Sequence, residues 1–308
     1  MGIEGRIFVT GATGFIGARV VQFLLDREHQ VAVLLRKPGV ARRIAALMPR
    51  LDVVEGDLFD LASYARQLEL LAPAHIIHLG WAGVAGASRN EALQYRNVMA
   101  FVDLMDLALR LGVHHFVGLG SQAEYGTHSG RLNETALVRP TTLYGAAKLA
   151  SYVLAERRLA LASLPFAWIR VFSTFGPDDD PGTMISYLTS ALLKRERPRL
   201  TAGEQKWDYL YVDDAARAII AVVEAHATGV FNLGSGYAHR LRHVIETVRD
   251  LIDPSLPLGF GELAYRQDQV MHLEADITKL KNSTGWVPRY SLEEGLALTV
   301  NWMRGIFL

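Results

Sequence analysis

The sequence predicts an α/β fold: a doubly wound parallel sheet followed by a smaller C-terminal α/β lobe. Two observations predict it. Short apolar runs alternate with longer amphipathic patterns from Arg6 to about Phe175, and the turn-rich stretch GPDDDPG then ends the alternation. Short strands that alternate with helices are typical of a parallel sheet built from right-handed βαβ units.

Apolar runs predict the strands of the sheet. In chain order they are IFVTG, QVAVLLR, LDVVEGD, HIIHLG, HHFVGLGS and FAWIRVFS. Helical patterns stand between them, in FIGARVVQFLLDR, GVARRIAALM, LASYARQLELL, residues 90–111 and residues 143–163. Shorter strands such as DYLYV and GVFNLG follow, mixed with helices. We therefore expect a first domain at 1–176 and a smaller lobe mainly at 177–308, with some chain returning to the first domain.

The composition excludes several classes of partner. The formal charge is zero and the basic residues are scattered, so there is no basic stripe for nucleic acid or an anionic membrane. The absence of cysteine suits a reducing cytosol, and the longest uncharged stretch, residues 70–88, is interrupted by Pro, His and Gly. We expect a cytoplasmic protein without a signal peptide that binds a small molecule. The opening MGIEGR resembles a protease-cleavage sequence left by cloning, although it could be native.

A glycine-rich turn stands at the first strand-to-helix junction. Gly11, Gly14 and Gly17 have G-x-x-G-x-x-G spacing in TGATGFIG. Glycines there permit a tight turn, let the backbone approach a pyrophosphate, and place that anion at the N-terminus of the following helix. The turn predicts that the first domain is a Rossmann-type dinucleotide-binding domain.

The residues after the second strand indicate which dinucleotide is bound. An acidic side chain usually binds the ribose 2′-hydroxyl of NAD at this point, but Leu35 stands there. Arg36 and Lys37 follow, and a guanidinium suits a 2′-phosphate, so NADP(H) is favoured and NAD(H) is possible. Two solvated charges are the alternative interpretation. Asp57, after the third strand, is placed either to reach the adenine or to cap the strand end.

Three residues form a candidate proton-transfer set. Ser121 ends the fifth strand, while Tyr144 and Lys148 lie four residues apart at the start of a long helix. Ligands of parallel sheets bind outside the carboxyl ends of the strands, so Ser121 is expected to face the cofactor crevice. We expect Lys148 to lower the pKa of Tyr144 from its usual value near 10. Tyr144 then exchanges a proton with a substrate oxygen that Ser121 hydrogen-bonds.

The order of the motifs resembles the extended short-chain dehydrogenase/reductase family, in its nucleotide-sugar epimerase, dehydratase and reductase branch. The resemblance is carried by the glycine turn, the Ser, Tyr and Lys set, RVFSTFGP, WDYLYVDDAARAI, NLGSG and LEADITKLKNSTGWVPRYSLEEGL, over nearly the whole chain. It implies a nicotinamide-dependent enzyme that acts on a sugar nucleotide bound between two lobes. It also implies a homodimer through the helices at 90–111 and 143–163.

Two sets of contact residues are expected. Those expected at the cofactor are Gly11, Thr13, Gly14, Phe15, Ile16, Gly17, Arg36, Lys37, Asp57, Leu58, Leu79, Gly80, Trp81, Tyr144 and Lys148. Those expected at the substrate are Trp81, Ser121, Gln122, Ser173, Trp207 and Arg266. Arg266, in YRQDQ, matches the position from which the family commonly binds the substrate pyrophosphate, and a surface arginine is the alternative interpretation.

Some positions depart from the pattern of the family. Sugar 4,6-dehydratases typically carry an Asp-Glu pair directly after the Ser or Thr, whereas Gln122 and Ala123 stand here. Ser173 replaces the usual Asn after the sixth strand, and Trp207 replaces a usual Arg, with Lys206 beside it. The acid and base for removing water are therefore missing, and the phosphate contacts differ from the pattern.

Two reactions fit these residues. NADPH-dependent reduction of the 4-keto group of an NDP-4-keto-6-deoxyhexose, in deoxysugar biosynthesis, is favoured because Arg36 and the missing acid favour an exchangeable NADP(H). The alternative is an NAD-dependent nucleotide-sugar 4-epimerase, in which the same residues act while a hydride leaves and returns. A reductase of small aromatic ketones and a non-catalytic NADP sensor are less favoured.

Two other groups of polar residues are interpreted as structural. His75 and His78 lie three apart on a predicted strand, hence on opposite faces, and cannot jointly hold a metal, so no metal site is expected. The aspartates at 178–180 are interpreted as a solvated loop, with a lid over the substrate as the minor alternative.

Overall fold

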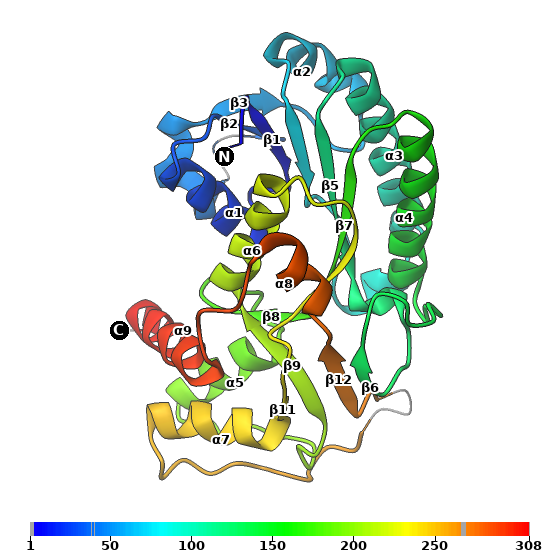
Figure 1. Ribbon diagram of the computed structural model, residues 1–308. Coiled ribbons are helices and arrows are strands. Elements are labelled where there is room, and N and C mark those ends of the chain that lie inside the picture. Colours follow the sequence, from blue (N-terminus) through cyan, green and yellow to red (C-terminus); the bar gives the residue numbers. More distant parts are fainter. Residues whose placement is uncertain (1–2, 38, 40, 266–268, 308) are drawn as a thin grey trace.

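The computed structural model describes residues 3–37, 39, 41–265 and 269–307. Its larger lobe holds a seven-stranded sheet in the order β10-β7-β5-β4-β1-β2-β3, in which each described strand pair is parallel (Figure 1). Because later strands lie on both sides of β1, the sheet is doubly wound and the predicted α/β class is confirmed. The strands are β1 (Ile7–Thr10), β2 (Val31–Leu35), β3 (Asp52–Glu55), β4 (His75–His78), β5 (His115–Ser121), β7 (Phe166–Val171) and β10 (Gly229–Leu233).

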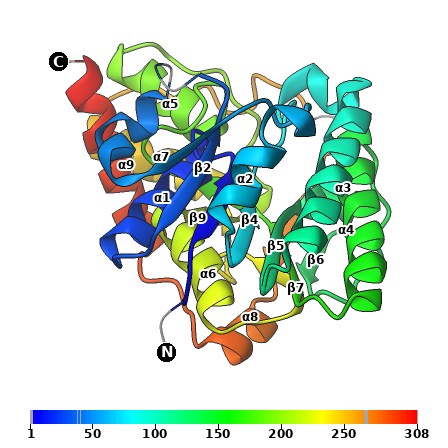
Figure 2. The same ribbon diagram turned by 90° about the horizontal axis from the view of Figure 1, so that it is seen from above.

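Helices cover both faces of this sheet. α1 (Phe15–Asp26) and α6 (Val212–Glu224) pack together on one face, and α3 (Leu93–Leu111) and α4 (Leu143–Leu161) pack together on the other (Figure 2). The short α2 (Ala65–Leu71) belongs to the second layer. Each layer buries its own apolar cluster against the sheet, which explains why the strands read as nearly continuous apolar runs. Among the described helices, none is long and apolar enough to cross a membrane.

One predicted helix differs from expectation. The stretch GVARRIAALM leads into a 3₁₀ helix, η2 (Arg42–Arg50), that contains Pro49. Proline has no N–H, and its ring clashes with the carbonyl four residues earlier in an α-helix, so α-helical bonding cannot extend through this end. Among the described residues, three shorter 3₁₀ turns lie in connections: η3 (Leu61–Ser63), η4 (Gly86–Asn90) and η5 (Gln122–Glu124).

The smaller lobe has a sheet of order β11-β9-β12-β6, with β8 paired to β9. Its helices α5 (Met184–Leu193), α7 (Leu241–Ile252) and α9 (Leu292–Phe307) pack against one another beside it (Figure 1). The chain passes between the two lobes more than once. β6 and β8 belong to the smaller lobe although they precede residue 177, and α6, β10 and α8 (Thr278–Thr284) pack in the larger lobe although they follow it. The strands are β6 (Gly130–Leu132), β8 (Ser173–Phe175), β9 (Lys206–Tyr211), β11 (Ala238–Arg240) and β12 (His272–Ala275).

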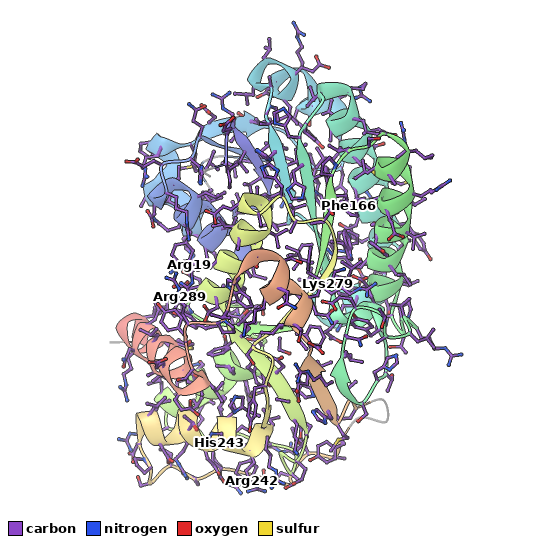
Figure 3. All side chains as sticks on the ribbon, in the orientation of Figure 1. Arg19, Phe166, Arg242, His243, Lys279 and Arg289 are labelled. Atoms are coloured by element: carbon purple, nitrogen blue, oxygen red, sulfur yellow. The ribbon has the colours of Figure 1, made fainter. Side chains whose placement is uncertain are left out.

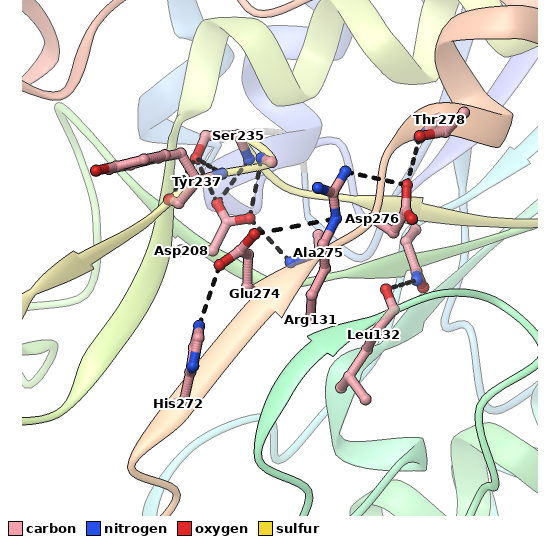
Figure 4. A network of polar contacts seen from close by, with 12 residues as sticks. Arg131, Leu132, Asp208, Ser235, Tyr237, His272, Glu274, Ala275, Asp276 and Thr278 are labelled. Carbon is pink, nitrogen blue, oxygen red and sulfur yellow. Dashed lines mark hydrogen bonds and ion pairs between the residues drawn. The ribbon is translucent and has the colours of Figure 1, made fainter.

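A buried carboxylate on β9, Asp208, joins three segments of the smaller lobe (Figure 4). Its Oδ1 accepts hydrogen bonds from the backbone N–H and the hydroxyl of Ser235, at 2.6 and 2.7 Å. Its Oδ2 accepts from the backbone N–H groups of Gly236 and Ala275, at 3.0 and 3.1 Å. These four donors compensate the carboxylate for its lost hydration. They fix β9 against β12 and the loop after β10, and so hold the neighbouring Trp207 in place.

Candidate functional site

The glycine turn after β1 has the close packing that its sequence predicts. Gly11 has a φ of 73°, and a Cβ on Gly17 would lie 2.1 Å from the carbonyl oxygen of Gly11. Only glycine fits either position, because one needs left-handed backbone and the other leaves no room for a side chain. α1 begins directly after Gly14, and no side chain among the described residues caps it. The N–H groups of its first turn are therefore available to an anion.

Two cavities meet at this turn, and all the residues expected at the cofactor line them. The first cavity, about 390 Å³, lies at the ends of β2 and β3, and the second, about 480 Å³, lies between the glycine turn, the end of β5 and the start of α4. Gly11 and Trp81 line both. The first cavity also contains Thr13, Arg36, Lys37, Asp57, Leu58 and Gly80. The second contains Gly14, Phe15, Ile16, Gly17, Leu79, Tyr144 and Lys148.

Ser121 lies in the second cavity, at the last position of β5. Its Oγ accepts a hydrogen bond from the backbone N–H of Ala123 at 3.2 Å, and its own backbone N–H donates to Glu124 at 2.8 Å. This reciprocal capping of η5 fixes the serine rotamer and leaves the hydroxyl proton free to donate. Gln122 follows in η5 and is half-buried.

Tyr144 lies in the first turn of α4, opposite Ser121. The hydroxyl of Thr142 caps this helix by accepting from the N–H of Gly145 at 3.1 Å, which sets where the turn begins. The side chains of Tyr144 and Ser121 line the same cavity, close enough for the serine hydroxyl to act on the pKa of the tyrosine. Burial raises the pKa of Tyr144 above its usual value near 10, while the hydrogen bond with Ser121 and the charge of Arg89 act in the opposite direction.

Lys148 lies one helical turn after Tyr144, but it does not act on the tyrosine as predicted. Its Nζ donates to the carbonyl of Leu119 at 2.6 Å and lies 3.7 Å from the ring centroid of Trp81. Burial lowers the pKa of Lys148 to about 7, so its charge is only partly present at neutral pH. The expectation that Lys148 lowers the pKa of Tyr144 is therefore wrong for this structure, in which the lysine is committed to a strand carbonyl and an indole face.

Arg89 is a neighbour of the site that the sequence did not reveal. It lies on η4, and its guanidinium carbon is 4.9 Å from the ring centroid of Tyr144. Its Nε is buried without a hydrogen-bond partner among the described residues. The guanidinium is the cation that lowers the pKa of Tyr144. No sequence motif marks Arg89, because only the path of the loop after β4 brings it to α4.

Four of the six residues expected at the substrate line two cavities, whereas Gln122 lines neither of them. Trp81 and Ser121 line the second cavity, whereas Ser173 and Trp207 line a third cavity of about 240 Å³. The second and third cavities share Thr174, Asp179 and Thr183. The indole N–H of Trp207 donates to the carbonyl of Val270 at 2.9 Å. Arg266 lies outside the described residues.

The sequence predicts that the aspartate loop at 178–180 is solvated, but the structure shows that it contacts other segments and lines two cavities. Arg42 donates to the Asp178 carboxylate at 2.7 Å, and the guanidinium of Arg43 donates to the Asp178 carbonyl at 2.8 Å and to the Thr13 carbonyl at 3.0 Å. Arg43 thus ties this loop to the glycine turn. Asp179 lines both the second and the third cavity. The loop therefore forms one wall of the candidate site.

Asp179→Asn should change how stability depends on pH. Burial raises the pKa of Asp179 to about 6, whereas the unfolded chain has a value near 3.8. Between these two pH values the native state holds more protons than the unfolded state, so the stability of the natural protein falls as pH rises from about 4 to 6. The asparagine variant lacks this loss, which amounts to at most about 3 kcal/mol. Urea unfolding of both proteins at pH 4 and pH 7 measures the difference, and equal slopes against pH would contradict it.

The parallel sheet, the glycine turn and the set of Ser121, Tyr144 and Lys148 define an extended short-chain dehydrogenase/reductase, as the resemblance of the motifs predicts. The sequence profile of the NAD dependent epimerase/dehydratase family matches residues 7–234, and the chain belongs to this family.

Similarity to known proteins extends over both lobes. The chain is 27% identical to the dTDP-L-rhamnose 4-epimerase of Burkholderia thailandensis. The alignment has 350 positions and covers 98% of this chain and 96% of that protein. It is 28% identical over 323 residues to a dTDP-glucose 4,6-dehydratase of Xanthomonas campestris, covering 96% and 92%. The solved structure of the UDP-glucose 4-epimerase of Thermus thermophilus, in complex with NAD, superposes with a TM-score of 0.86 at 25% identity, covering 97% of this chain and 99% of that one.

Proposed function

We propose that this protein is a nucleotide-sugar 4-epimerase that works with a bound nicotinamide dinucleotide, and that NAD is the favoured form. The observation that carries the proposal is that the hydroxyls of Ser121 and Tyr144 share the second cavity, while Gln122 and Ala123 follow Ser121 in the sequence. Two hydroxyls can assist oxidation and reduction at one sugar carbon, whereas elimination of water needs a further acid and base. Similar proteins named as 4-epimerases support this choice over the reductase predicted from Arg36.

The residues present fit such a cofactor. The side-chain-free surface of Gly11 and Gly17 and the uncapped first turn of α1 suit a pyrophosphate. The first cavity would hold the adenosine and the second the nicotinamide ribose and ring. When bound, the nicotinamide ring supplies a hydride acceptor and donor.

Each hydroxyl has its own task in the proposed reaction. Tyr144 takes the proton of the sugar 4-hydroxyl during oxidation and returns it during reduction. The Oγ of Ser121 already accepts a hydrogen bond from Ala123. Its hydroxyl donates a hydrogen bond to the same sugar oxygen and stabilises the negative charge that develops there. Lys148 lies within the second cavity, where its amine would bond the nicotinamide ribose. Ser173 and Trp207, in the adjoining third cavity, would flank the nucleotide part of the substrate.

A turnover assay tests this function. The purified protein is incubated with a small amount of NAD and a panel of UDP- and dTDP-hexoses, and the configuration at C4 is followed by proton NMR. We expect interconversion of C4 epimers with no net change in nicotinamide absorbance. Stoichiometric consumption of NADPH with an NDP-4-keto-6-deoxyhexose, without epimer formation, would overturn the proposal.

A 4-keto reductase is the second candidate, and one observation favours it. Arg36 and Lys37 both line the first cavity and are exposed, and no acid stands at Leu35 where NAD-binding proteins usually carry one. A guanidinium there suits a 2′-phosphate. Arg36→Ala should weaken NADPH binding by at least about tenfold and leave NADH binding nearly unchanged, if the guanidinium binds that phosphate. Equal effects on both dinucleotides, measured by fluorescence titration, would remove this support.

Arg89→Met should shift the pH profile of epimerisation. The charge of Arg89 lowers the pKa of Tyr144, so its loss raises that pKa and moves the acid limb of kcat to higher pH, by about one pH unit. Arg89→Lys keeps a cation and should largely restore the profile. An unchanged acid limb in the methionine variant would show that Arg89 does not act on the tyrosine.

We also propose a homodimer formed through α3 and α4. Tyr95 and Met99 on α3, and Val153 and Leu154 on α4, are large apolar side chains that are about half exposed or more. Leu154→Glu should convert the dimer into a monomer, measured by light scattering after gel filtration, because it places a charge in an apolar interface. Leu70→Glu, at an exposed leucine on α2, is the matched control and should remain dimeric.

A further inference from the structure

Three histidines from separate segments meet at the end of the large sheet opposite the two cavities. His75 begins β4, His115 begins β5, and His226 follows α6. One ring nitrogen of each lies within 4.8 Å of one ring nitrogen of each of the others. His75 and His115 are paired residues of adjacent parallel strands, so their side chains lie on the same face of the sheet. β5 runs seven residues from His115 to Ser121, which separates the cluster from the candidate active site by about 20 Å.

The hydrogen bonds of the two buried rings fix which nitrogen is free. Nε2 of His75 lies 3.0 Å from the carbonyl oxygen of Glu4, and Nε2 of His115 lies 3.0 Å from the carbonyl oxygen of Ala227. A carbonyl only accepts, so each Nε2 carries the proton and each Nδ1 has a lone pair. His75 and His115 are 1% and 0% exposed, and the Nδ1 atom of each is buried without a hydrogen-bond partner among the described residues. Each of the two strand histidines therefore keeps one buried nitrogen whose lone pair a ligand could use.

We propose that His75, His115 and His226 bind a divalent transition-metal ion, with Zn²⁺ as the physiological candidate. Neutral imidazole is a ligand of choice for Zn²⁺, Ni²⁺ and Cu²⁺, and three histidines leave a fourth position for water. The N–H-to-carbonyl bonds of His75 and His115 are the orienting contacts that metal-binding histidines usually make on their other nitrogen.

His226 gives the site access and the freedom to close. It is exposed and has a φ of 47°, at the turn directly after α6. Tetrahedral zinc with nitrogen ligands needs ligand atoms about 3.3 Å apart, so the rings must approach by up to about 1.5 Å. The ring of His226 is exposed and can move toward the two buried strand histidines.

Metal titration of the tag-free, chelator-treated protein tests the site. Zn²⁺ is followed by calorimetry and Co²⁺ by its visible absorption, whose intensity reports tetrahedral coordination. We expect one equivalent bound, a rise of Tm with added Zn²⁺, and an affinity lowered at least about tenfold in His226→Ala. The exposed position of His226 makes this variant suitable, because replacing His75 or His115 disturbs the buried sheet. Unchanged NAD binding in His226→Ala shows that the variant is folded.

Two control variants separate this cluster from other imidazoles. The ring of His114 lies 5.9 Å from that of His75, and His243, on α7 in the smaller lobe (Figure 3), is stacked with His239. His114→Ala and His243→Ala should each keep the single equivalent. Absence of stoichiometric binding in the natural protein, equal affinity in His226→Ala, or loss of binding in His243→Ala would each overturn the proposal. None of these results depends on whether the protein is an epimerase.

Discussion

Tyr144→Phe should lower kcat for epimerisation by about 10²- to 10⁴-fold, the usual contribution of a positioned general acid and base. The hydroxyl is the only part of the side chain removed, and Tyr144 shares the second cavity with Ser121. The ring itself keeps its contacts with Trp81 and Arg89, because these involve the ring and not the oxygen. Cofactor affinity should therefore change by less than about threefold. Steady-state rates and NAD titration measure the two quantities separately.

A matched control lies on the same helix. Tyr152 is two turns after Tyr144 on α4, and its hydroxyl bonds Glu156 at the surface of the molecule. Tyr152→Phe also removes a phenolic oxygen, but Tyr152 lines neither the first nor the second cavity. Its kcat should therefore stay within about twofold of the natural value. Equal losses in the two variants would indicate a general effect on α4, and full activity of Tyr144→Phe would remove this tyrosine from the mechanism.

The parts of the site that follow strand ends could be predicted from the sequence. The glycine turn is local, since Gly11 and Gly17 are in contact within one strand-to-helix junction. Ser121 and Tyr144 are further apart in the chain, but a serine that ends a parallel strand and a tyrosine that begins the next helix must lie at the same edge of the sheet. Spacing and element type were therefore sufficient to bring these residues together.

The rest of the site depends on packing between segments that no local pattern records. Arg89 reaches Tyr144 through the path of the loop after β4, and Asp179 acquires its raised pKa by burial against residues of other elements. His115 and His226 join His75 only because β5 is the neighbour of β4 and α6 ends beside both. The choice between a reductase and an epimerase could not be predicted either, because Ser121 and Tyr144 serve both reactions.

Behind Ser121 lies a buried ion pair whose effect on stability is expected to be large. Glu124 and Arg170 have side chains that are 0% and 3% exposed, and Nε of Arg170 donates to the Glu124 carboxylate at 2.8 Å. The same carboxylate accepts from the backbone N–H of Ser121 at 2.8 Å and from the indole of Trp168 at 3.0 Å. Arg170 also donates to the hydroxyl of Tyr125 at 3.0 Å. The pair thus connects the end of β5, which carries Ser121, to β7.

Arg170→Met should lower the free energy of unfolding by about 3–5 kcal/mol, because it leaves the Glu124 carboxylate buried without a counter-charge. The loss should be much larger than that of Arg158→Met, whose guanidinium lies 3.1 Å from Asp106 in a pair that is half exposed. Exposed pairs of that kind contribute about 0–1 kcal/mol. Urea unfolding of the two variants measures both losses, and similar values would contradict the importance of burial.

The double variant Glu124→Gln/Arg170→Met separates the cost of the orphaned charge from the value of the pair. A neutral glutamine keeps a side-chain oxygen that can accept from Ser121 and Trp168, so the double variant should be more stable than Arg170→Met alone. If Arg170→Met also lowers kcat and the hydrogen bond to the Ser121 backbone is what holds the serine, kcat should recover in the double variant together with stability. If stability recovers but kcat does not, the charge on Glu124 is what orients Ser121. If stability does not recover, the sheet requires the packing of the Arg170 side chain and not its charge.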